Sequence, residues 1–298
     1  YLSQKIQDKQ ALITSTDTDL TKNTAKTKLF NIENGKIIEV SKEEKAADEA
    51  YDFTGKYVAP GFIDIHTHIL PGVDDGAKDL DQAMELLRLA WDNGTAAVIL
   101  TPHYRGRYRK NTPQQLRQVF DTLKQRAAQE LPDMKLYLGN EAGIELELAE
   151  RLSEGRVLSL NDGNYVLLEF HTATSAPQIL DGVLDVLNCG FTPIIAHAER
   201  YDAFCQNKKL AAEVIGFGAL IQVNADSILG GAGYASKRCA RRLLRRHQAH
   251  FVASDAHDAT RRHPLLTPCY QKVSKKYGKE YADRVFRENA HELLEEST

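Results

Sequence analysis

Short apolar runs that alternate with longer amphipathic stretches occupy the chain from residue 61 onward. Between the first two runs, Leu80, Met84 and Leu87 recur at helical spacing, Asp79 is a suitable N-cap and Gly94 ends the pattern. Repeated strand and helix units of this kind form a parallel sheet covered by helices. The fold class is therefore α/β, with predicted strands at Phe62–Ile65, Ala96–Leu100, Lys135–Leu138, Tyr165–Glu169, Pro193–Ala196, Ala219–Val223 and Phe251–Ala253.

Side chains that bind metals in proteins stand at the ends of these strands. In a barrel of parallel strands the carboxyl ends meet at one rim, so residues distant in sequence converge there. A cluster of buried carboxylates is costly unless something offsets its charge, and metal coordination does so. The candidate ligands at strand ends are His66, His68, His103, Glu141, Glu169, His197, Asp255 and His257.

Ligands of this kind indicate hydrolytic chemistry. Mixed imidazole and carboxylate sets suit manganese, iron or zinc, whereas sites made only of oxygen suit magnesium or calcium. Coordination lowers the pKa of water towards about 7, so that hydroxide is available at neutral pH. Cations also offset the charge that gathers on the oxygens when phosphorus is attacked. The sequence therefore predicts a metal-dependent hydrolase.

Six ordered segments resemble the PHP (polymerase and histidinol phosphatase) superfamily, and most closely the manganese-dependent protein-tyrosine phosphatases of bacterial capsular and exopolysaccharide operons. These segments are His66–Ala77, Thr101–Tyr104, Leu167–Phe170, Ile194–Tyr201, Gln222–Asn224 and Ala253–His257. The similarity runs from about Gly61 to about Glu296. It implies a distorted (βα)7 TIM-like barrel, the PHP fold, over residues 61–298.

The resemblance also implies a site with three divalent metal ions, with manganese expected and iron or zinc as alternatives. Carried over by motif, the first ion would be held by His66, His68, Glu141 and Asp255, the second by Glu141, Glu169 and His197, and the third by Asp75, His103 and His257. Arg200 and Arg262 stand where the family grips phosphate. The loop with Arg105, Arg107, Arg109 and Lys110 either adds positive charge to this rim or is solvated, and both interpretations stay open.

The activity that the resemblance implies is hydrolysis of phosphotyrosine by a metal-bound hydroxide. The substrate would be the phosphorylated tail of a bacterial tyrosine autokinase that controls polysaccharide synthesis. A phenolate, with a reference pKa of about 10, leaves more readily than a serine alkoxide and needs little acid catalysis. Histidinol phosphate, the substrate of relatives in the superfamily, is the nearest competitor, and a non-catalytic module that binds a phosphorylated tail is a third interpretation.

Residues 1–60 differ from the phosphatase family and form a separate predicted extension. The first 26 residues are polar without periodicity and are expected to be an irregular arm. Lys28–Ile32 and Lys36–Val40 flank Asn34-Gly35, which predicts a small β-hairpin. The approach to His66 resembles the opening segment of amidohydrolases such as dihydroorotases, so hydrolysis of a cyclic amide is an alternative function. Against it, the chain ends in a helical pattern over Tyr281–Glu296, and the segments where a bridging lysine would be expected offer Glu141 and Glu169 instead.

Composition limits the partners and the compartment. A net charge of -3 gives no bulk attraction to nucleic acid or to anionic membranes. No apolar run approaches the roughly 20 residues that a membrane span needs. The four cysteines lack a C-x-x-C pair, so a reduced cytoplasm is expected. Cys239 and Arg245 have the C-x5-R spacing of cysteine-dependent phosphatases, but their apolar neighbours predict a helix. The sequence does not determine the oligomeric state.

Overall fold

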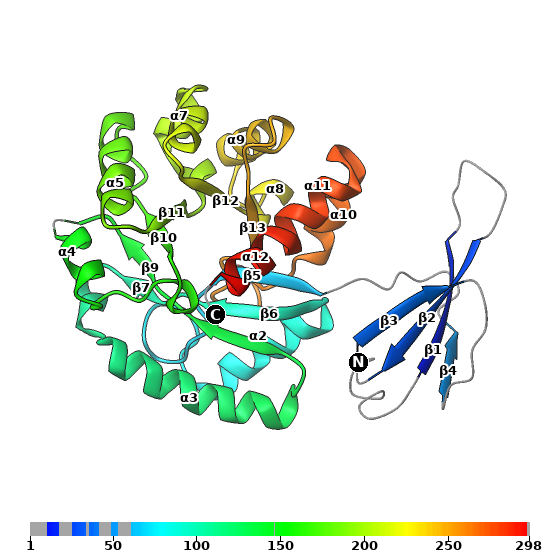
Figure 1. Ribbon diagram of the computed structural model, residues 1–298. Helices are drawn as coiled ribbons and strands as arrows, with labels where there is room; N and C mark the ends of the chain where they lie inside the picture. Colours follow the sequence, from blue (N-terminus) through cyan, green and yellow to red (C-terminus); the bar gives the residue numbers. More distant parts are fainter. Residues whose placement is uncertain are drawn as a thin grey trace. The chain divides into compact units, whose positions relative to one another are not determined.

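The computed structural model describes residues 61–145 and 147–296, together with the earlier segments 11–17, 26–33, 36–41 and 49–52. The chain divides into two compact units, Tyr1–Pro60 and Gly61–Thr298 (Figure 1). The first unit holds strands β1 to β4, and the second holds the described helices together with strands β5 to β13.

The N-terminal unit contains a four-stranded sheet of order β3-β2-β1-β4. Strands β2 (Lys26–Glu33) and β3 (Lys36–Ser41) are antiparallel, as the predicted hairpin requires, although the turn residues 34 and 35 lie outside the described residues. The expectation of an irregular arm is wrong for β1 (Ala11–Asp17), which pairs along its whole length with β2. Its β-branched residues suit a strand, but a short strand among polar residues becomes evident only through its partner. Strand β4 (Glu49–Asp52) pairs with β1 in parallel.

A ring of parallel strands forms the second unit. One sheet contains β5 (Phe62–Thr67), β6 (Thr95–Leu100) and β8 (Lys135–Leu138). The other contains β7 (His103–Tyr104), β9 (Glu141–Gly143), β10 (Tyr165–Glu169), β11 (Thr192–Ile195), β12 (Leu220–Asn224) and β13 (Phe251–Ala253). A bridge between Thr67 and Ala256 connects β5 to the residues after β13. Every predicted strand of this unit is present, and the α/β, TIM-like fold is confirmed.

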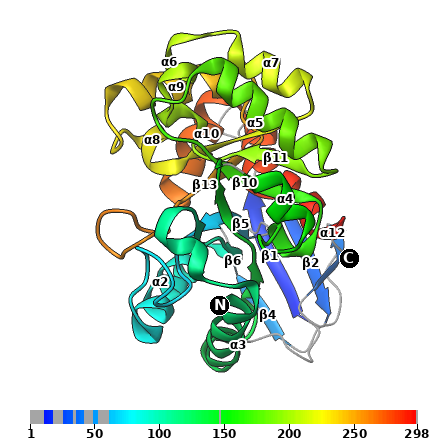
Figure 2. The ribbon, with the colours of Figure 1, turned by 90° about the vertical axis from the view of Figure 1, so that its left-hand side faces the viewer.

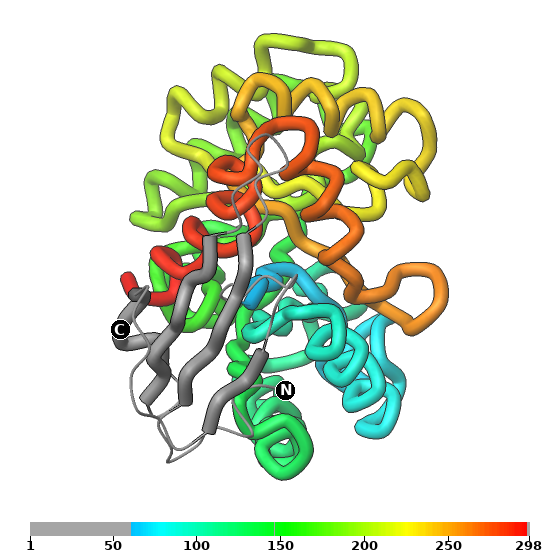
Figure 3. The backbone as a smooth tube through the Cα atoms, turned by 90° about the vertical axis from the view of Figure 1, so that its right-hand side faces the viewer, coloured from blue at the N-terminus to red at the C-terminus, as the bar shows by residue number. Residues whose placement is uncertain are grey.

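Helices cover the outside of this curled sheet, with α5, α7 and α9 along the strands β10 to β13 (Figures 1 and 2). Figure 3 traces the unit from β5 in blue to α12 in red. The helices are α2 (Leu80–Asp92), α3 (Pro113–Glu130), α4 (Leu148–Ser153), α5 (Ala176–Asn188), α6 (Asp202–Gln206), α7 (Leu210–Gly216), α8 (Ala225–Leu229), α9 (Tyr234–Arg245), α10 (Thr267–Tyr277), α11 (Lys279–Asp283) and α12 (Asn289–Glu295). No helix among the described residues is long and apolar enough to cross a membrane.

Local sequence accounts for several of these boundaries. The Asp79 side chain accepts a hydrogen bond from the Gln82 N–H at 2.9 Å and caps α2, while Gly94, with φ of 88°, follows its end. The predicted C-terminal helix is confirmed as α11, a π-helical turn at Arg284–Glu288 and α12. Cys239 and Arg245 both lie in α9, so the helical interpretation of that segment is confirmed.

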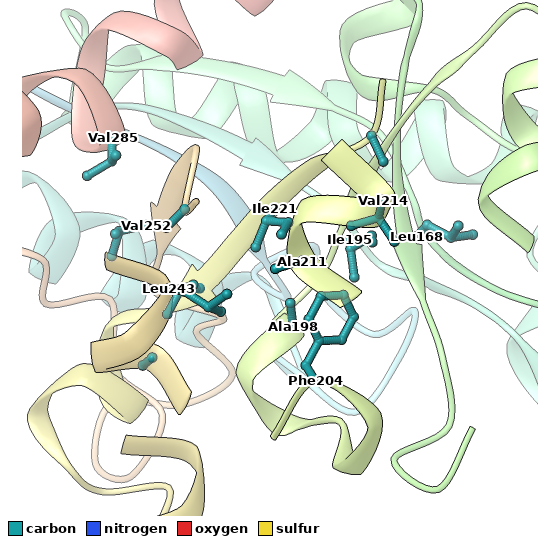
Figure 4. Packing of buried hydrophobic residues seen from close by; sticks show 14 of the residues in the cluster. Leu168, Ile195, Ala198, Phe204, Ala211, Val214, Ile221, Leu243, Val252 and Val285 are labelled. Carbon is teal, nitrogen blue, oxygen red and sulfur yellow. The ribbon is translucent and has the colours of Figure 1, made fainter. Parts of the chain in front are cut away.

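Strand alternation separates an outer core from an inner one. Along β10, Leu168 packs with Ile195 and Ile221 in the cluster between strands and helices (Figure 4). Leu167 instead packs inside the ring in a second cluster that includes Ile65. Because side chains alternate along a strand, the inward face that carries Leu167 also carries the last residue of β10, Glu169. The packed interior therefore ends in polar residues at the carboxyl rim.

Candidate metal centre

Two imidazoles at the end of β5 turn their Nε2 atoms toward each other. His66 and His68 are fully buried, and their Nε2 atoms are 3.2 Å apart. His66 Nδ1 lies 3.1 Å from Gln222 Oε1, and His68 Nδ1 lies 2.7 Å from Asp74 Oδ2. These acceptors assign the protons to the Nδ1 atoms, so two Nε2 lone pairs face one another. A cation between them would offset their repulsion, as in metal sites whose histidines donate their second N–H to a fixed acceptor.

Glu141, the first residue of β9, is fully buried among four imidazoles. Its Oε1 lies 3.3 Å from His66 Nε2 and 2.8 Å from His197 Nε2. Its Oε2 lies 3.3 Å from His68 Nε2 and 2.8 Å from His103 Nδ1. Burial alone would raise the pKa of Glu141, but the imidazoles of His66 and His103 outweigh it and lower that pKa well below its usual range. A carboxylate placed in this way is suited to bridge two ions.

A chain of side-chain amides connects three of the predicted ligands. Gln222 Oε1 accepts a hydrogen bond from the backbone N–H of His197 at 2.7 Å, in addition to facing His66 Nδ1. Gln222 Nε2 donates to Asn224 Oδ1 at 2.8 Å, and Asn224 Nδ2 donates to Asp255 Oδ2 at 2.7 Å. Both amides stand on β12 two residues apart, so strand alternation turns them to the same side. We call Gln222 and Asn224 the amide relay.

A further group of ligands lies at the rim. Asp75 Oδ1 is 3.4 Å from His103 Nε2 and 3.7 Å from His257 Nε2. The Asp75 side chain is 46% exposed, whereas both imidazoles are buried. The adjacent Asp74 carboxylate accepts from the backbone N–H of His103 at 3.0 Å, so it supports this group as well as His68. Neighbouring aspartates therefore take different roles, one exposed beside two imidazoles and one buried beneath them.

The spacing of these atoms fits divalent transition metals. Metal bonds of about 2.0–2.2 Å place neighbouring ligand atoms about 3.0–3.6 Å apart. Asp255 Oδ1 lies 3.5 Å from the Nε2 atoms of both His66 and His68. In the described part of the chain, several buried atoms of these residues have no hydrogen-bond partner, among them Glu169 Oε2, Asp255 Oδ1 and His257 Nε2. Orphaned acceptors of this kind are expected where cations bind.

All nine predicted ligands take part in groups whose atoms lie within 4.8 Å of one another. These groups are His68, Asp75, His103 and His257; His66, His68 and Glu141; His66, His197 and Asp255; and His103, Glu141 and Glu169. His103 approaches both the Asp75 group and the pair of glutamates. The structure thus brings the nine residues together, while their division among individual ions stays a prediction.

Three arginines line a cavity above this centre. The cavity has a volume of about 240 Å³, and we call it the catalytic cavity. Arg200 Nη1 donates to Asp255 Oδ2 at 3.2 Å, and Arg262 Nη2 donates to the same oxygen. The two side chains are 38% and 37% exposed, so their remaining N–H groups are available to a ligand. Arg105 Nη1 lies 3.0 Å from Glu169 Oε1. Negative oxygens entering the cavity would therefore meet guanidinium groups from three different loops.

The arginines of the loop after His103 differ in where they lie, at the cavity or away from it. Arg105 is the member that lines the cavity. Arg107 instead donates to Tyr108 Oη at 2.8 Å, and Arg109 pairs with Glu145 at 2.9 Å. Positive charge at the cavity therefore comes from one residue of this loop.

Crowding shifts the titration of two ligands in opposite directions. Burial and the charge of Glu141 raise the pKa of Glu169 to about 8, against the opposing effect of Arg105. Burial and the neighbouring His68 lower the pKa of His257 to about 2, which keeps its imidazole neutral. A bound cation favours the ionised carboxylate and therefore lowers the pKa that burial raises. A neutral imidazole is the form that binds metal.

The backbone holds two of the predicted ligands in an unusual conformation. The φ angle is 32° at His197 and 56° at Asp255, in the left-handed region that residues other than glycine rarely adopt. Each such residue costs about 1–3 kcal/mol and persists where surrounding contacts impose it. The contacts here are the hydrogen bonds of His197 N to Gln222 Oε1 and of Asp255 N to the carbonyl oxygen of His66 at 2.9 Å.

Sequence reasoning assigned no role to Asp74, Gln222 or Asn224. The signal for the last two was a pair of amides at alternate positions at the end of a predicted strand, where apolar residues would be expected to continue. Asp74 could not be distinguished from Asp75 by residue type. Their roles follow from contacts between strands that lie far apart in the sequence.

Residues 62–295 match the family described as capsular polysaccharide synthesis, CpsB/CapC. The tyrosine-protein phosphatase CpsB of Streptococcus pneumoniae is 33% identical over 237 residues, which cover 78% of this chain and 98% of that protein. A solved structure from work on YwqE of Bacillus subtilis and CpsB of Streptococcus pneumoniae, described as unique metal-dependent tyrosine phosphatases, is also similar. It superposes with a TM-score of 0.74 at 34% identity, over 79% of this chain and 95% of that one.

A D-hydantoinase structure shares the fold over more of this chain but with lower sequence identity. The superposition covers 93% of this chain and 80% of the hydantoinase chain, with a TM-score of 0.59 at 14% identity. This coverage exceeds the unit Gly61–Thr298, so it includes part of the N-terminal unit. The likeness concerns the fold alone. Among the described residues that line the catalytic cavity there is no lysine, which an amidohydrolase centre of the expected type would use.

Proposed function

This chain belongs to the capsular polysaccharide synthesis CpsB/CapC family, and we propose that it is a metal-dependent phosphatase that hydrolyses phosphotyrosine in proteins. One observation carries the proposal: the facing Nε2 atoms of His66 and His68, with Asp255 beside them, lie next to the arginines Arg200 and Arg262. A metal centre and a guanidinium pair that share one carboxylate are suited to a phosphoryl group. The related proteins named as tyrosine phosphatases support the same activity.

The proposed centre holds three divalent ions, with manganese expected and iron or zinc as alternatives. His66, His68, Glu141 and Asp255 would hold the first ion, Glu141, Glu169 and His197 the second, and Asp75, His103 and His257 the third. The mixed nitrogen and oxygen donors and the orphaned buried atoms support this assignment. When bound, such ions activate water for attack on phosphorus and offset the charge of the phosphoryl oxygens.

The protein's own residues would bind and orient the phosphoryl group. Arg200 and Arg262 are held by Asp255 Oδ2, which fixes one edge of each guanidinium and leaves other N–H groups for the non-bridging oxygens. Arg105, held by Glu169, adds a donor from the opposite loop. The amide relay would keep the His66 ring and the backbone of His197 in place while substrate enters.

A phenolate leaving group suits this cavity because its departure needs little acid catalysis, and the tyrosines near the centre already take part in hydrogen bonds. Tyr201 lines the cavity, but its Oη accepts a hydrogen bond from the Phe170 N–H at 3.1 Å. Burial raises the pKa of Tyr201 well above its usual value, so it is a weak acid. Tyr104 Oη similarly accepts from Arg151 at 3.2 Å. An alkyl phosphate such as phosphoserine would need more help to leave than these groups provide.

We further propose that the physiological substrate is the phosphorylated tail of a bacterial tyrosine kinase in polysaccharide synthesis. The family description, capsular polysaccharide synthesis, supports this setting. An exposed arginine-lined cavity also suits a chain segment that approaches from solvent. Histidinol phosphate is a smaller competitor for the same centre.

Steady-state kinetics with added Mn²⁺ test the proposal. We expect the highest kcat/KM on phosphotyrosine peptides, lower values on phosphoserine peptides and histidinol phosphate, and no turnover of hydantoin or dihydrouracil. The variant with both His66→Ala and His68→Ala should remain folded by circular dichroism, bind less metal and lose activity. Equal or better kcat/KM on phosphoserine or histidinol phosphate would refute the tyrosine assignment. An enzyme that is active without metal would refute the metal-dependent mechanism.

A further inference from the structure

A second cavity adjoins the catalytic cavity and shares two of its lining residues, Arg200 and Arg262. Its volume is about 130 Å³, roughly half that of the catalytic cavity. It lies between the segment at the start of α8 and the loop that follows β13. We call it the flanking cavity, and its lining includes Arg200, Asp226, Leu229, Arg261, Arg262 and His263.

Positive charge dominates the flanking cavity. Arg200 and Arg262 use part of their guanidinium groups on Asp255, and each retains further N–H donors. Arg261 adds a guanidinium that forms no ion pair with any residue in the described part of the chain. The lining contains two carboxylates, Asp226 and Asp255, against three guanidinium groups. Asp255 is already shared by Arg200 and Arg262.

A polar atom without a partner lies among these residues. His263 lines the flanking cavity, and its Nδ1 is enclosed yet has no hydrogen-bond partner among the described residues. Leu229 and Leu265 supply apolar surface on the same walls. The combination fits a small group with a charged oxygen end and a short apolar stem, because the oxygens meet N–H donors while the methylenes meet the leucines.

We propose that the flanking cavity binds the carboxylate of an aspartate or glutamate side chain close to the phosphotyrosine in the substrate. The inference rests on the proposed function. Because the two cavities share the same arginine pair, a phosphoryl group and a carboxylate would contact different edges of these guanidinium groups. Residues of an extended peptide are spaced about 3.3–3.6 Å apart, so an acidic residue a few positions from the phosphotyrosine can reach the flanking cavity. Arg261 would then determine sequence preference without contacting the reacting phosphorus.

Kinetics with matched peptides test this assignment. Each peptide carries one phosphotyrosine and blocked termini, and aspartate or asparagine occupies the same position in turn at one to four residues on either side. The enzymes are the wild type, Arg261→Gln, and the control Arg245→Gln, an exposed arginine on α9 away from the flanking cavity. A small aryl phosphate, which has no flanking residue, measures catalysis without the flanking cavity.

We expect the wild type and Arg245→Gln to favour the aspartate peptide at one or more positions by on the order of fivefold, through KM, which is the upper range for a partly exposed ion pair. Arg261→Gln should lose this preference while hydrolysing the aryl phosphate as the wild type does. Asp226→Asn, which removes the opposing carboxylate, should increase the preference.

Two outcomes would overturn the inference alone: equal use of aspartate and asparagine peptides by the wild type, or a preference that survives in Arg261→Gln. If no phosphotyrosine peptide is hydrolysed while another phosphate ester is, the proposed function fails first, and the inference fails with it. The aryl phosphate and the paired peptides therefore distinguish the two failures.

Discussion

Replacing Gln222 with methionine tests whether the amide relay orients the proposed metal ligands. Methionine has a similar length but accepts hydrogen bonds weakly, so His66 Nδ1 and the backbone N–H of His197 would both lose their acceptor. Each buried donor left unpaired costs about 1–3 kcal/mol, so we expect the free energy of unfolding to fall by about 2–6 kcal/mol. The residue is fully buried, so water does not readily replace the lost acceptor.

Metal affinity should fall as well, because the His66 ring would no longer be held with its Nε2 lone pair toward the centre. Loss of an outer partner of a metal-binding histidine typically weakens affinity about 10–100-fold. Isothermal titration of the metal-free protein with Mn²⁺ measures this directly, and urea unfolding of the same samples measures stability. Gln271→Met, at an exposed position on α10, is the matched control. If Gln222→Met lowered stability but bound Mn²⁺ as tightly as Gln271→Met does, the relay would support the fold and not the ligands.

Two further predictions concern charged residues beside the centre. Arg200→Lys and Arg262→Lys keep the charge but lose the planar fork, so each should lower kcat/KM on phosphotyrosine peptides about 10-fold or more with metal content unchanged. Wild-type kcat/KM in both variants would exclude a phosphate clamp. Burial raises the pKa of Glu199 from 4.5 to about 7, so folding takes up a proton between these pH values and stability falls as pH rises through that window. Glu199→Gln removes this linkage. The free energy of unfolding of the variant relative to that of the wild type, measured with urea, should therefore increase by on the order of 3 kcal/mol from pH 4.5 to pH 8. A difference between the two proteins that did not change with pH would contradict this account.

Much of the ring of strands could be predicted from local patterns. Each of the seven predicted strands combines an apolar run with a boundary residue, and such a run depends on the strand's own sequence. The short strands β7 and β9 carry no apolar run and were not predicted. The positions of His66, His103 and Asp255 followed because residues at the carboxyl ends of parallel strands meet at one rim. Strand β1 was missed because its pairing with β2 depends on a partner that local polarity does not reveal.

The sequence by itself determined the α/β class, the order of the strands and the set of residue types delivered to the rim, because periodicity and strand ends are local properties. Only the tertiary structure decided which of these residues touch. It placed four imidazoles around Glu141, turned Asp74 inward and Asp75 outward, and joined Gln222 to His66 at the end of β5 and to the backbone of His197 after β11. The physical reason is that contact distance, burial and hydrogen-bond partners depend on the register and curvature of the closed sheet, which no single segment of the chain encodes.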